Sequence, residues 1–265
     1  MSVQPVFSED VRTIDELVNF ALSEVSEELA WQAVSVLHRR GTAEVLQYAK
    51  RLSTSPCDRE RRLGADILGQ LGVPDRTFPV ECATILRGML DIEQDAAVLT
   101  SALIALSFQN CADAIPLAVR LSSHSSANVR HAVVLVLATE ECPTAVTCLV
   151  RMSRDTDNNV RDWGTFALGT LFDADTPEIR DALFDRVADP HDDTRGEALV
   201  GLARRSDPRV VDWLKTELAY DCVGSLAVEA AEAIASAELR QQLLNLQKWW
   251  DVDQDLLARA IAACG

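Results

Sequence analysis

The sequence is short of several features that define large classes of proteins. Aromatic residues make up only 5% of its 265 positions. No uninterrupted apolar run approaches the ~20 residues that cross a bilayer. The start of the chain lacks the basic segment and the apolar run of a signal peptide. We therefore expect a cytoplasmic protein without a membrane partner.

Motifs that would indicate chemistry are also missing. There is no HExxH, no phosphate-binding P-loop and no GxGxxG. The seven cysteines are dispersed without a CxxC pair, which favours free thiols over disulfides or a zinc site. Cys264, close to the end, is expected to be exposed. We predict no catalytic residue, no metal and no cofactor, and we favour a non-catalytic role.

The charge balance is strongly acidic, with 25 basic and 41 acidic residues and a net charge of −16. This argues against a nucleic-acid partner, because phosphate neutralisation dominates such binding. The segment Arg39–Arg62 is locally basic, and we interpret it as a solvated face rather than a site for an acidic partner. The acidic segment Asp173–Glu197 is able to attract a basic partner, although some of its acids belong to helix starts.

A two-helix pattern recurs along the whole chain. It is clearest in NNVRDWGTFALGTL, where Arg161 serves as a reference position. The same arrangement of apolar, small and charged residues fits seven further reference positions: Ala30, Arg61, Leu99, Arg130, Arg195, Ala227 and Leu257. Successive reference positions lie 30 to 38 residues apart. This spacing is typical of stacked helix pairs, because one pair alone cannot bury its apolar face.

Individual columns of the pattern agree with this. The third residue after the reference position is Ala or Gly in seven of eight repeats, and the seventh is Leu in six. Prolines where first helices should begin are Pro79, Pro143, Pro177 and Pro208. We predict an all-α fold, a right-handed α-solenoid of about seven to eight antiparallel helix pairs in one domain over residues 1–265. The expected repeats are 10–40, 41–72, 78–110, 113–140, 143–172, 176–205, 208–236 and 238–265.

The segment Asp155–Gly169, DTDNNVRDWGTFALG, resembles the HEAT repeat, in particular the short bacterial HEAT-like class associated with phycobilisome lyases. The resemblance covers about residues 20–265. In that family an acid and an arginine form a ladder along the stacked helices. The resemblance implies this structural role for Asp155 with Arg161 and for Asp189 with Arg195. The His-Glu pairs of HEAT-like iron hydroxylases are absent.

The favoured function is a non-catalytic scaffold or adaptor that binds a protein or peptide, with a basic partner as one option. The contact surface is expected on the concave face, lined by the second helices. Candidate contact residues stand one or five residues after reference positions: Trp31, Arg62, Asp66, His131, Asp162 and Glu232. The alternative is a bilin-lyase-like accessory or catalytic subunit that handles a chromophore. The sequence leaves the oligomeric state open.

The remaining tryptophans are expected to be mainly structural. Trp163, two residues after its reference position, and Trp213, within a first helix, are predicted to be core residues. Trp249 and Trp250 lie between the last two helices, where they are expected to cap the end of the repeat array.

Overall fold

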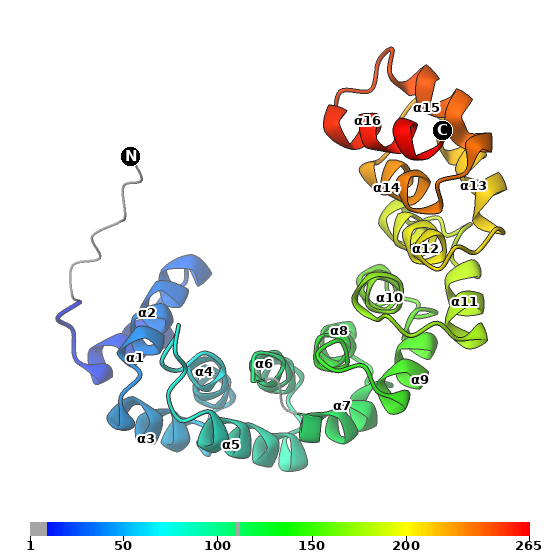
Figure 1. Ribbon diagram of the computed structural model, residues 1–265. Coiled ribbons are helices and arrows are strands. Elements are labelled where there is room, and N and C mark those ends of the chain that lie inside the picture. Colours follow the sequence, from blue (N-terminus) through cyan, green and yellow to red (C-terminus); the bar gives the residue numbers. More distant parts are fainter. Residues whose placement is uncertain (1–9, 110–111) are drawn as a thin grey trace. The chain divides into compact units, whose positions relative to one another are not determined.

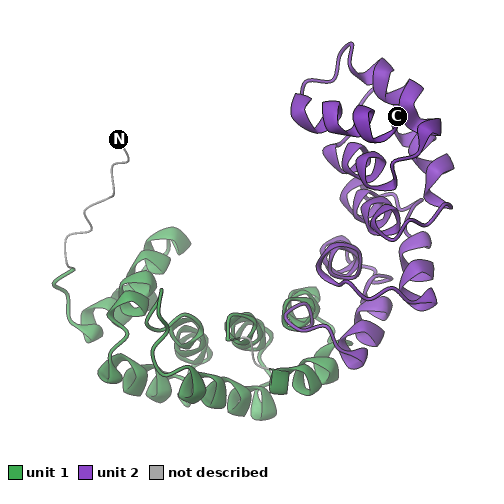
Figure 2. Cartoon of the chain, in the orientation of Figure 1, with its two compact units in different colours: residues 1–136 green, residues 137–265 purple. Residues whose placement is uncertain are grey.

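The computed structural model describes residues 10–109 and 112–265, and no strand occurs among them. The chain divides into two compact units, Met1–Val136 and Leu137–Gly265 (Figure 2). The prediction of an all-helical repeat fold is confirmed. The single domain expected from the repeats stays a prediction.

Unit 1 is built from helix pairs. Its first helices are α1 (Ile14–Ser23), α3 (Ala43–Leu52), α5 (Pro79–Ile92) and α7 (Ile115–Leu121), the last preceded by the short 3-10 helix η1 (Ala112–Ala114). Its second helices are α2 (Glu27–Arg40), α4 (Asp58–Gly69), α6 (Ala96–Ser107) and α8 (Ala127–Leu137), which ends at the boundary of the unit. Helix α4 packs against both α2 and α6.

Unit 2 continues the same arrangement. Its first helices are α9 (Pro143–Met152), α11 (Pro177–Phe184), α13 (Val210–Glu217) and α15 (Arg240–Leu246), the last preceded by the 3-10 helix η3 (Ala237–Leu239). Its second helices are α10 (Asn158–Phe166), α12 (Asp192–Arg204), α14 (Ser225–Ile234) and α16 (Gln254–Ala263). Helix α10 continues into a π-helical turn, η2 (Ala167–Leu171). Figure 1 shows the first helices along one side of the unit and the second helices along the other. We call α10, α12, α14 and α16 the second-helix row of unit 2.

Local sequence explains where the helices begin. Pro79, Pro143 and Pro177 each occupy the first turn of a first helix, where a missing amide hydrogen costs no helical bond. Pro208 differs, because α13 begins only at Val210. Side-chain caps are common at the second helices; Asp157, for example, accepts hydrogen bonds from the first amides of α10.

The small-residue column has a direct packing reason. A Cβ added at Gly64 would lie 2.8 Å from the amide nitrogen of Ser53, which ends the first helix of the same pair. At Gly164 the equivalent distance, to Ser153, is 3.0 Å. In these two pairs, the second helix thus crosses closely over the end of its own first helix. The leucine column forms the core beside this crossing, where every member is at most 1% exposed: Leu37, Leu68, Leu106, Leu137, Leu168 and Leu202.

Three expectations about single residues are wrong. Trp163 and Trp213 are 39% and 38% exposed rather than buried. Trp163 shares its repeat position with Glu197 and Glu229, on a side of the second helix that is incompletely covered. Trp213 lies in α13, directly after the exposed residue Asp212. Cys264 is buried, because the turn that ends α16 directs its Sγ to the main-chain oxygen of Ala231 in α14.

The two terminal tryptophans have different environments. Trp250 is buried, and its Nε1 donates a hydrogen bond to the main-chain oxygen of Val223 at 2.7 Å. Trp249 remains about half exposed. Of these two tryptophans, only Trp250 therefore packs into the core of unit 2.

Candidate functional site

Arg161, in α10, connects two successive repeats of unit 2. Its Nη1 donates to the main-chain oxygen of Asp155 at 2.9 Å, and its Nε and Nη2 donate to the carboxylate of Asp189 at 2.8 and 2.9 Å. The two side chains are 8% and 3% exposed. A two-point contact of this kind fixes orientation as well as adding energy. Burial alone would raise the pKa of Asp189, but the hydrogen bond from Arg161 and further contacts outweigh it and lower the pKa.

Arg195 and Arg61 are placed in the same way. Arg195 donates to the main-chain oxygen of Asp189 at 2.9 Å and to both carboxylate oxygens of Glu217 at 3.0 Å. Arg61 donates to the carboxylate of Glu93, in the next repeat, at 2.7 and 3.1 Å. The expected pairing of an acid with the arginine six residues later is therefore a main-chain contact. The carboxylate partner comes from further along the chain.

A second set of contacts lies at the opposite ends of the second helices, and the sequence reasoning missed it. Arg205, which follows α12, is 9% exposed and donates to main-chain oxygens at 2.8 to 3.1 Å. These acceptors are Leu168, Gly169, Phe172, Ala174 and Gly201. They include the turn η2 and the end of α12. Burial lowers the pKa of Arg205 from its ordinary value.

Gln109 plays the corresponding part in unit 1, where its Nε2 donates to the main-chain oxygens of Leu68 and Gly69. Gln109 and Arg205 each stand ten residues after a reference position. In the sequence, these two repeats share only a side chain with a hydrogen-bond donor ten residues after the reference position. The residue type differs between them. Both side chains satisfy carbonyl groups that a helix end leaves without partners.

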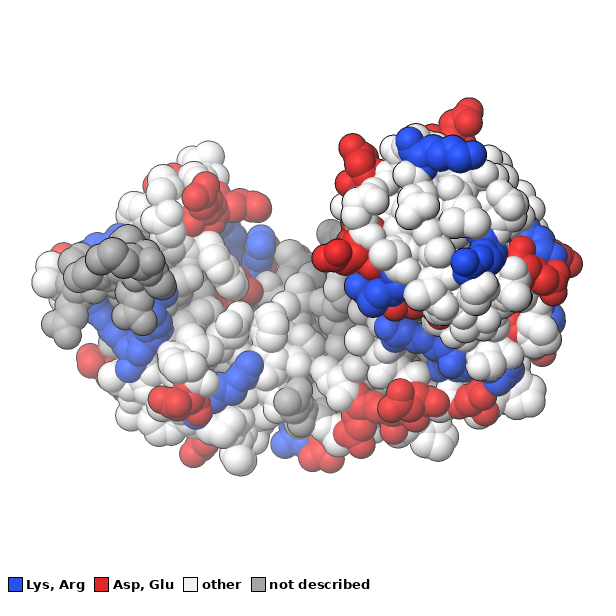
Figure 3. Space-filling view, turned by 45° about the horizontal axis from the view of Figure 1, so that its top comes forward, with Lys and Arg blue, Asp and Glu red and all other residues white. Residues whose placement is uncertain are grey.

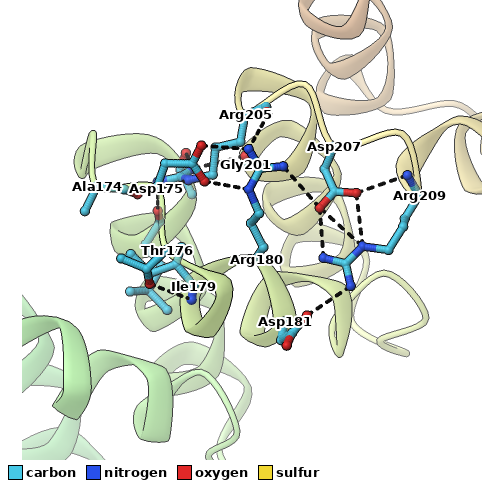
Figure 4. A network of polar contacts seen from close by, with 12 residues as sticks. Ala174, Asp175, Thr176, Ile179, Arg180, Asp181, Gly201, Arg205, Asp207 and Arg209 are labelled. Atoms are coloured by element: carbon cyan, nitrogen blue, oxygen red, sulfur yellow. Dashed lines mark hydrogen bonds and ion pairs between the residues drawn. The ribbon is translucent and has the colours of Figure 1, made fainter.

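Much of the acidic segment Asp173–Glu197 is used within unit 2. Figure 4 shows Arg180 between Asp175 and Asp207, with Nε 2.6 Å from the Asp175 carboxylate and Nη1 3.4 Å from that of Asp207. Arg209 also contacts Asp207, at 2.8 Å, and Asp181, at 3.0 Å. Five of the nine acids in the segment form ion pairs: Asp175, Asp181, Asp185, Asp189 and Asp192. The segment is thus less available to a partner than its composition indicates.

A groove crosses the second-helix row of unit 2. It has a volume of about 340 Å³ and is lined by residues of α12, α14 and α16 and by Asp253, which caps α16. Its apolar residues are Val200, Ala233 and Leu256, and its charged residues are Arg204, Glu229, Glu232, Asp253 and Arg259. No first-helix residue belongs to this lining, so the groove lies on the side of the row away from the first helices.

The charges of this groove are unevenly satisfied. Glu232 receives Nε of Arg259 at 2.8 Å, and Nη1 of Arg204 donates to the main-chain oxygen of Thr170 at 3.1 Å. Glu229 has no ion pair or hydrogen bond with any side chain in residues 10–109 or 112–265. The groove therefore contains a carboxylate that its own cations leave unpaired.

Glu197 of α12 lies beside this groove and is half-buried. Thr170, in the turn η2, donates a hydrogen bond to its carboxylate at 3.1 Å. The pKa of Glu197 is raised to about 7, mainly by burial and also by the nearby carboxylates of Asp162 and Glu229, against the opposing effect of Thr170 and Arg204. Burial likewise raises the pKa of Asp162. Both shifts mean that the surroundings of these two acids favour their protonated forms.

The six predicted contact residues all lie on second helices, four of them in unit 1 and two in unit 2. In unit 1, Trp31 of α2 is 47% exposed. In α4, Nε of Arg62 lies 4.0 Å from a carboxylate oxygen of Asp66. His131, in α8, is half-buried. In unit 2, Asp162 accepts a 3.4 Å hydrogen bond from the hydroxyl group of Thr194, on the next second helix. Of the six, only Glu232 lines the groove described above.

The basic segment Arg39–Arg62 is partly engaged in contacts within unit 1. Arg40 and Arg59 donate to main-chain oxygens, and Arg61 pairs with Glu93. Figure 3 shows acidic and basic groups interspersed with uncharged surface on the face that it displays. Among the described residues, no group of three or more His, Cys, Asp or Glu side chains is arranged to hold a metal ion. None of the described helices has the length and apolar character of a membrane span.

Comparison with known proteins agrees with this architecture. A model of HEAT repeats matches residues 83–169. The resemblance to HEAT repeats inferred from the sequence is confirmed over this segment. Protein YibA of Escherichia coli strain K12 is 26% identical over 237 residues, which is 85% of this chain and 82% of YibA. The X-ray structure of YibA superposes with a TM-score of 0.82 at 24% identity, covering 96% of this chain and 92% of that chain.

A more distant HEAT-like structure is the complex of CpcE and CpcF of phycocyanin lyase from Nostoc. It has a TM-score of 0.48 and 15% identity, and the match covers all of this chain and 98% of the matched one. At this level of similarity, the lyase complex supports no inference about activity.

Proposed function

We propose that this HEAT-repeat chain is a non-catalytic binding module that holds a segment of a protein partner on its second-helix row. The observation that carries the proposal is the groove across α12, α14 and α16. It combines apolar residues with charged groups on three successive second helices. Repeat proteins bind partners through such surfaces, because each repeat adds a few side chains to one continuous face. A protein partner also fits the net charge of −16 better than a nucleic acid does.

The experiment is affinity capture from a lysate of the source organism, followed by mass spectrometry. The groove is altered by Glu229→Arg. The matched control is Glu238→Arg, in η3, where the exposed carboxylate pairs with Lys215 of a first helix. We expect a partner that is captured by the wild type and the control and lost with Glu229→Arg. Equal capture by all three, or capture of no protein by the wild type, would contradict the proposal.

Unit 1 is tested separately with the double variant Arg62→Ala, His131→Ala, which alters two of the predicted contact residues. Weakened capture with an unchanged melting temperature would extend the binding surface to α4 and α8. The chromophore-handling alternative is tested by mixing the protein with a bilin and recording its visible spectrum. A coloured complex would favour that alternative.

A further inference from the structure

The unpaired carboxylate of Glu229 is the starting point for naming what the groove binds. Glu229 projects from α14, the middle helix of the three that line the groove. The two cations of the lining are already directed elsewhere, Arg259 to Glu232 and Arg204 to the main-chain oxygen of Thr170. Glu197 of α12 does not line the groove, but its carboxylate lies near enough to Glu229 and Arg204 to interact with both electrostatically. The acceptor capacity of the groove therefore exceeds what its own donors supply.

The apolar residues of the groove are compatible with an occupant that has an alkyl portion. Val200 and Leu256 line the groove but are only 2% and 3% exposed, and Ala233 contributes a small exposed side chain. Lysine and arginine combine a stem of methylene groups with a charged end, so that they cover apolar surface while their charge stays with a polar partner. An acidic side chain would instead meet Glu229 and Glu232 at the same surface. A volume of about 340 Å³ also has room for the neighbouring main chain of an extended segment.

Resting on the proposed function, we propose that the groove binds a lysine or arginine side chain of an extended protein segment. The charged end lies between Glu197 and Glu229, and the stem lies over Val200 and Leu256. The bound cation supplies the donors that Glu229 lacks and offsets the repulsion between the two carboxylates. Charge complementarity of this kind selects the partner and steers its approach.

The probes are four synthetic peptides with the same Gly/Ser-rich sequence and a fluorescent label. Two equivalent positions carry arginine, lysine, citrulline or glutamate. Citrulline is the matched control, because it keeps the shape of arginine and removes its charge. Fluorescence anisotropy with the full chain at low and physiological salt should show the arginine and lysine peptides binding about tenfold more tightly than the citrulline peptide. The glutamate peptide should bind most weakly.

The variants locate this preference in the groove. Glu229→Gln and Glu197→Gln should each remove most of the difference between arginine and citrulline peptides, whereas Glu238→Gln should leave it unchanged. Glu229→Arg should reverse the preference toward the glutamate peptide. That reversal separates recognition of charge from a loss of folding, and circular dichroism melting provides the folding control for every variant.

Several results would overturn the inference: equal affinity for arginine and citrulline peptides, no measurable binding of the arginine peptide, or full retention of the preference in Glu229→Gln. If affinity capture still finds a partner that depends on the groove, the binding module stands and only the named occupant is wrong. If capture fails as well, the proposed function falls with it.

Discussion

Replacing Arg205 by methionine tests whether a buried guanidinium holds two successive repeats of unit 2 together. Methionine keeps an unbranched side chain of similar reach and removes every donor. In the wild type, the guanidinium supplies hydrogen bonds to five main-chain oxygens, at 2.8 to 3.1 Å. In the described part of the chain it pairs with no carboxylate. The substitution therefore removes donors without stranding an acidic partner.

The magnitude follows from the acceptors that are left behind. Each buried acceptor without a partner costs about 1–3 kcal/mol. Phe172 and Leu168 are buried residues, so water does not readily replace the lost donors at their carbonyl groups. The cost of burying the Arg205 charge is recovered on substitution, which offsets part of the loss. We expect a net decrease of about 3 kcal/mol in the free energy of unfolding, at the lower end of the range for breaking buried charged contacts.

Urea unfolding followed by circular dichroism measures this change, and hydrogen exchange at η2 shows where it acts. The matched control is Arg204→Met, one residue earlier, whose exposed side chain makes a single 3.1 Å contact with Thr170. We expect the control to lose less than about 1 kcal/mol. If Arg205→Met is as stable as the control and η2 exchanges no faster, the contacts of Arg205 do not stabilise the unit and the reasoning is wrong.

Three further predictions concern packing, pH and thiol reactivity. Gly201→Ala should lower the free energy of unfolding by about 1–3 kcal/mol, because the new Cβ would lie 2.6 Å from the Cα of Gly169 in η2. Gly88→Ala, where nothing lies within 4 Å, should be neutral or stabilising in a urea titration. Because the pKa of Glu197 is raised from 4.5 to about 7, folding favours its protonated form. Wild type should therefore lose stability relative to Glu197→Gln as the pH rises through this range, and parallel urea midpoints across it would contradict the assignment. Cys57 and Cys222 are exposed, so changing both to serine should remove two fast-reacting thiols in a native titration with a disulfide reagent; an unchanged fast phase would show that neither is accessible.

The repeat architecture was predictable because it depends on short-range patterns. The columns of small residues and leucines recur at helical spacing, and prolines such as Pro79 stand at helix starts. These features act within one helix or one helix pair. Gly64 and Gly164, for example, are required where a second helix crosses the end of its own first helix. The exposure of Trp163 was not predictable, because helical spacing does not show which side of a repeat is left uncovered.

The groove was not predictable, apart from the position of Glu232 on it. Its residues come from the second helices of three successive repeats, and Glu197 acquires its raised pKa only through burial among side chains from neighbouring helices. The partner of each ladder arginine was also beyond the pattern, since Arg161 reaches a carboxylate 28 residues away.

The sequence by itself determined that this chain is all-helical, where several of its first helices begin, and which leucines of the second helices are buried. Periodicity and local capping are sufficient for these features, because they act over a few turns of one helix. The tertiary structure alone decided which charges are neutralised and which are left over. That outcome depends on how successive helices cross: the crossing brings Arg161 to Asp189 and Arg205 to the main-chain oxygens of η2. Within the part of the chain that the structure describes, it leaves Glu229 in the groove without a cation, because Arg204 and Arg259 are directed to other acceptors.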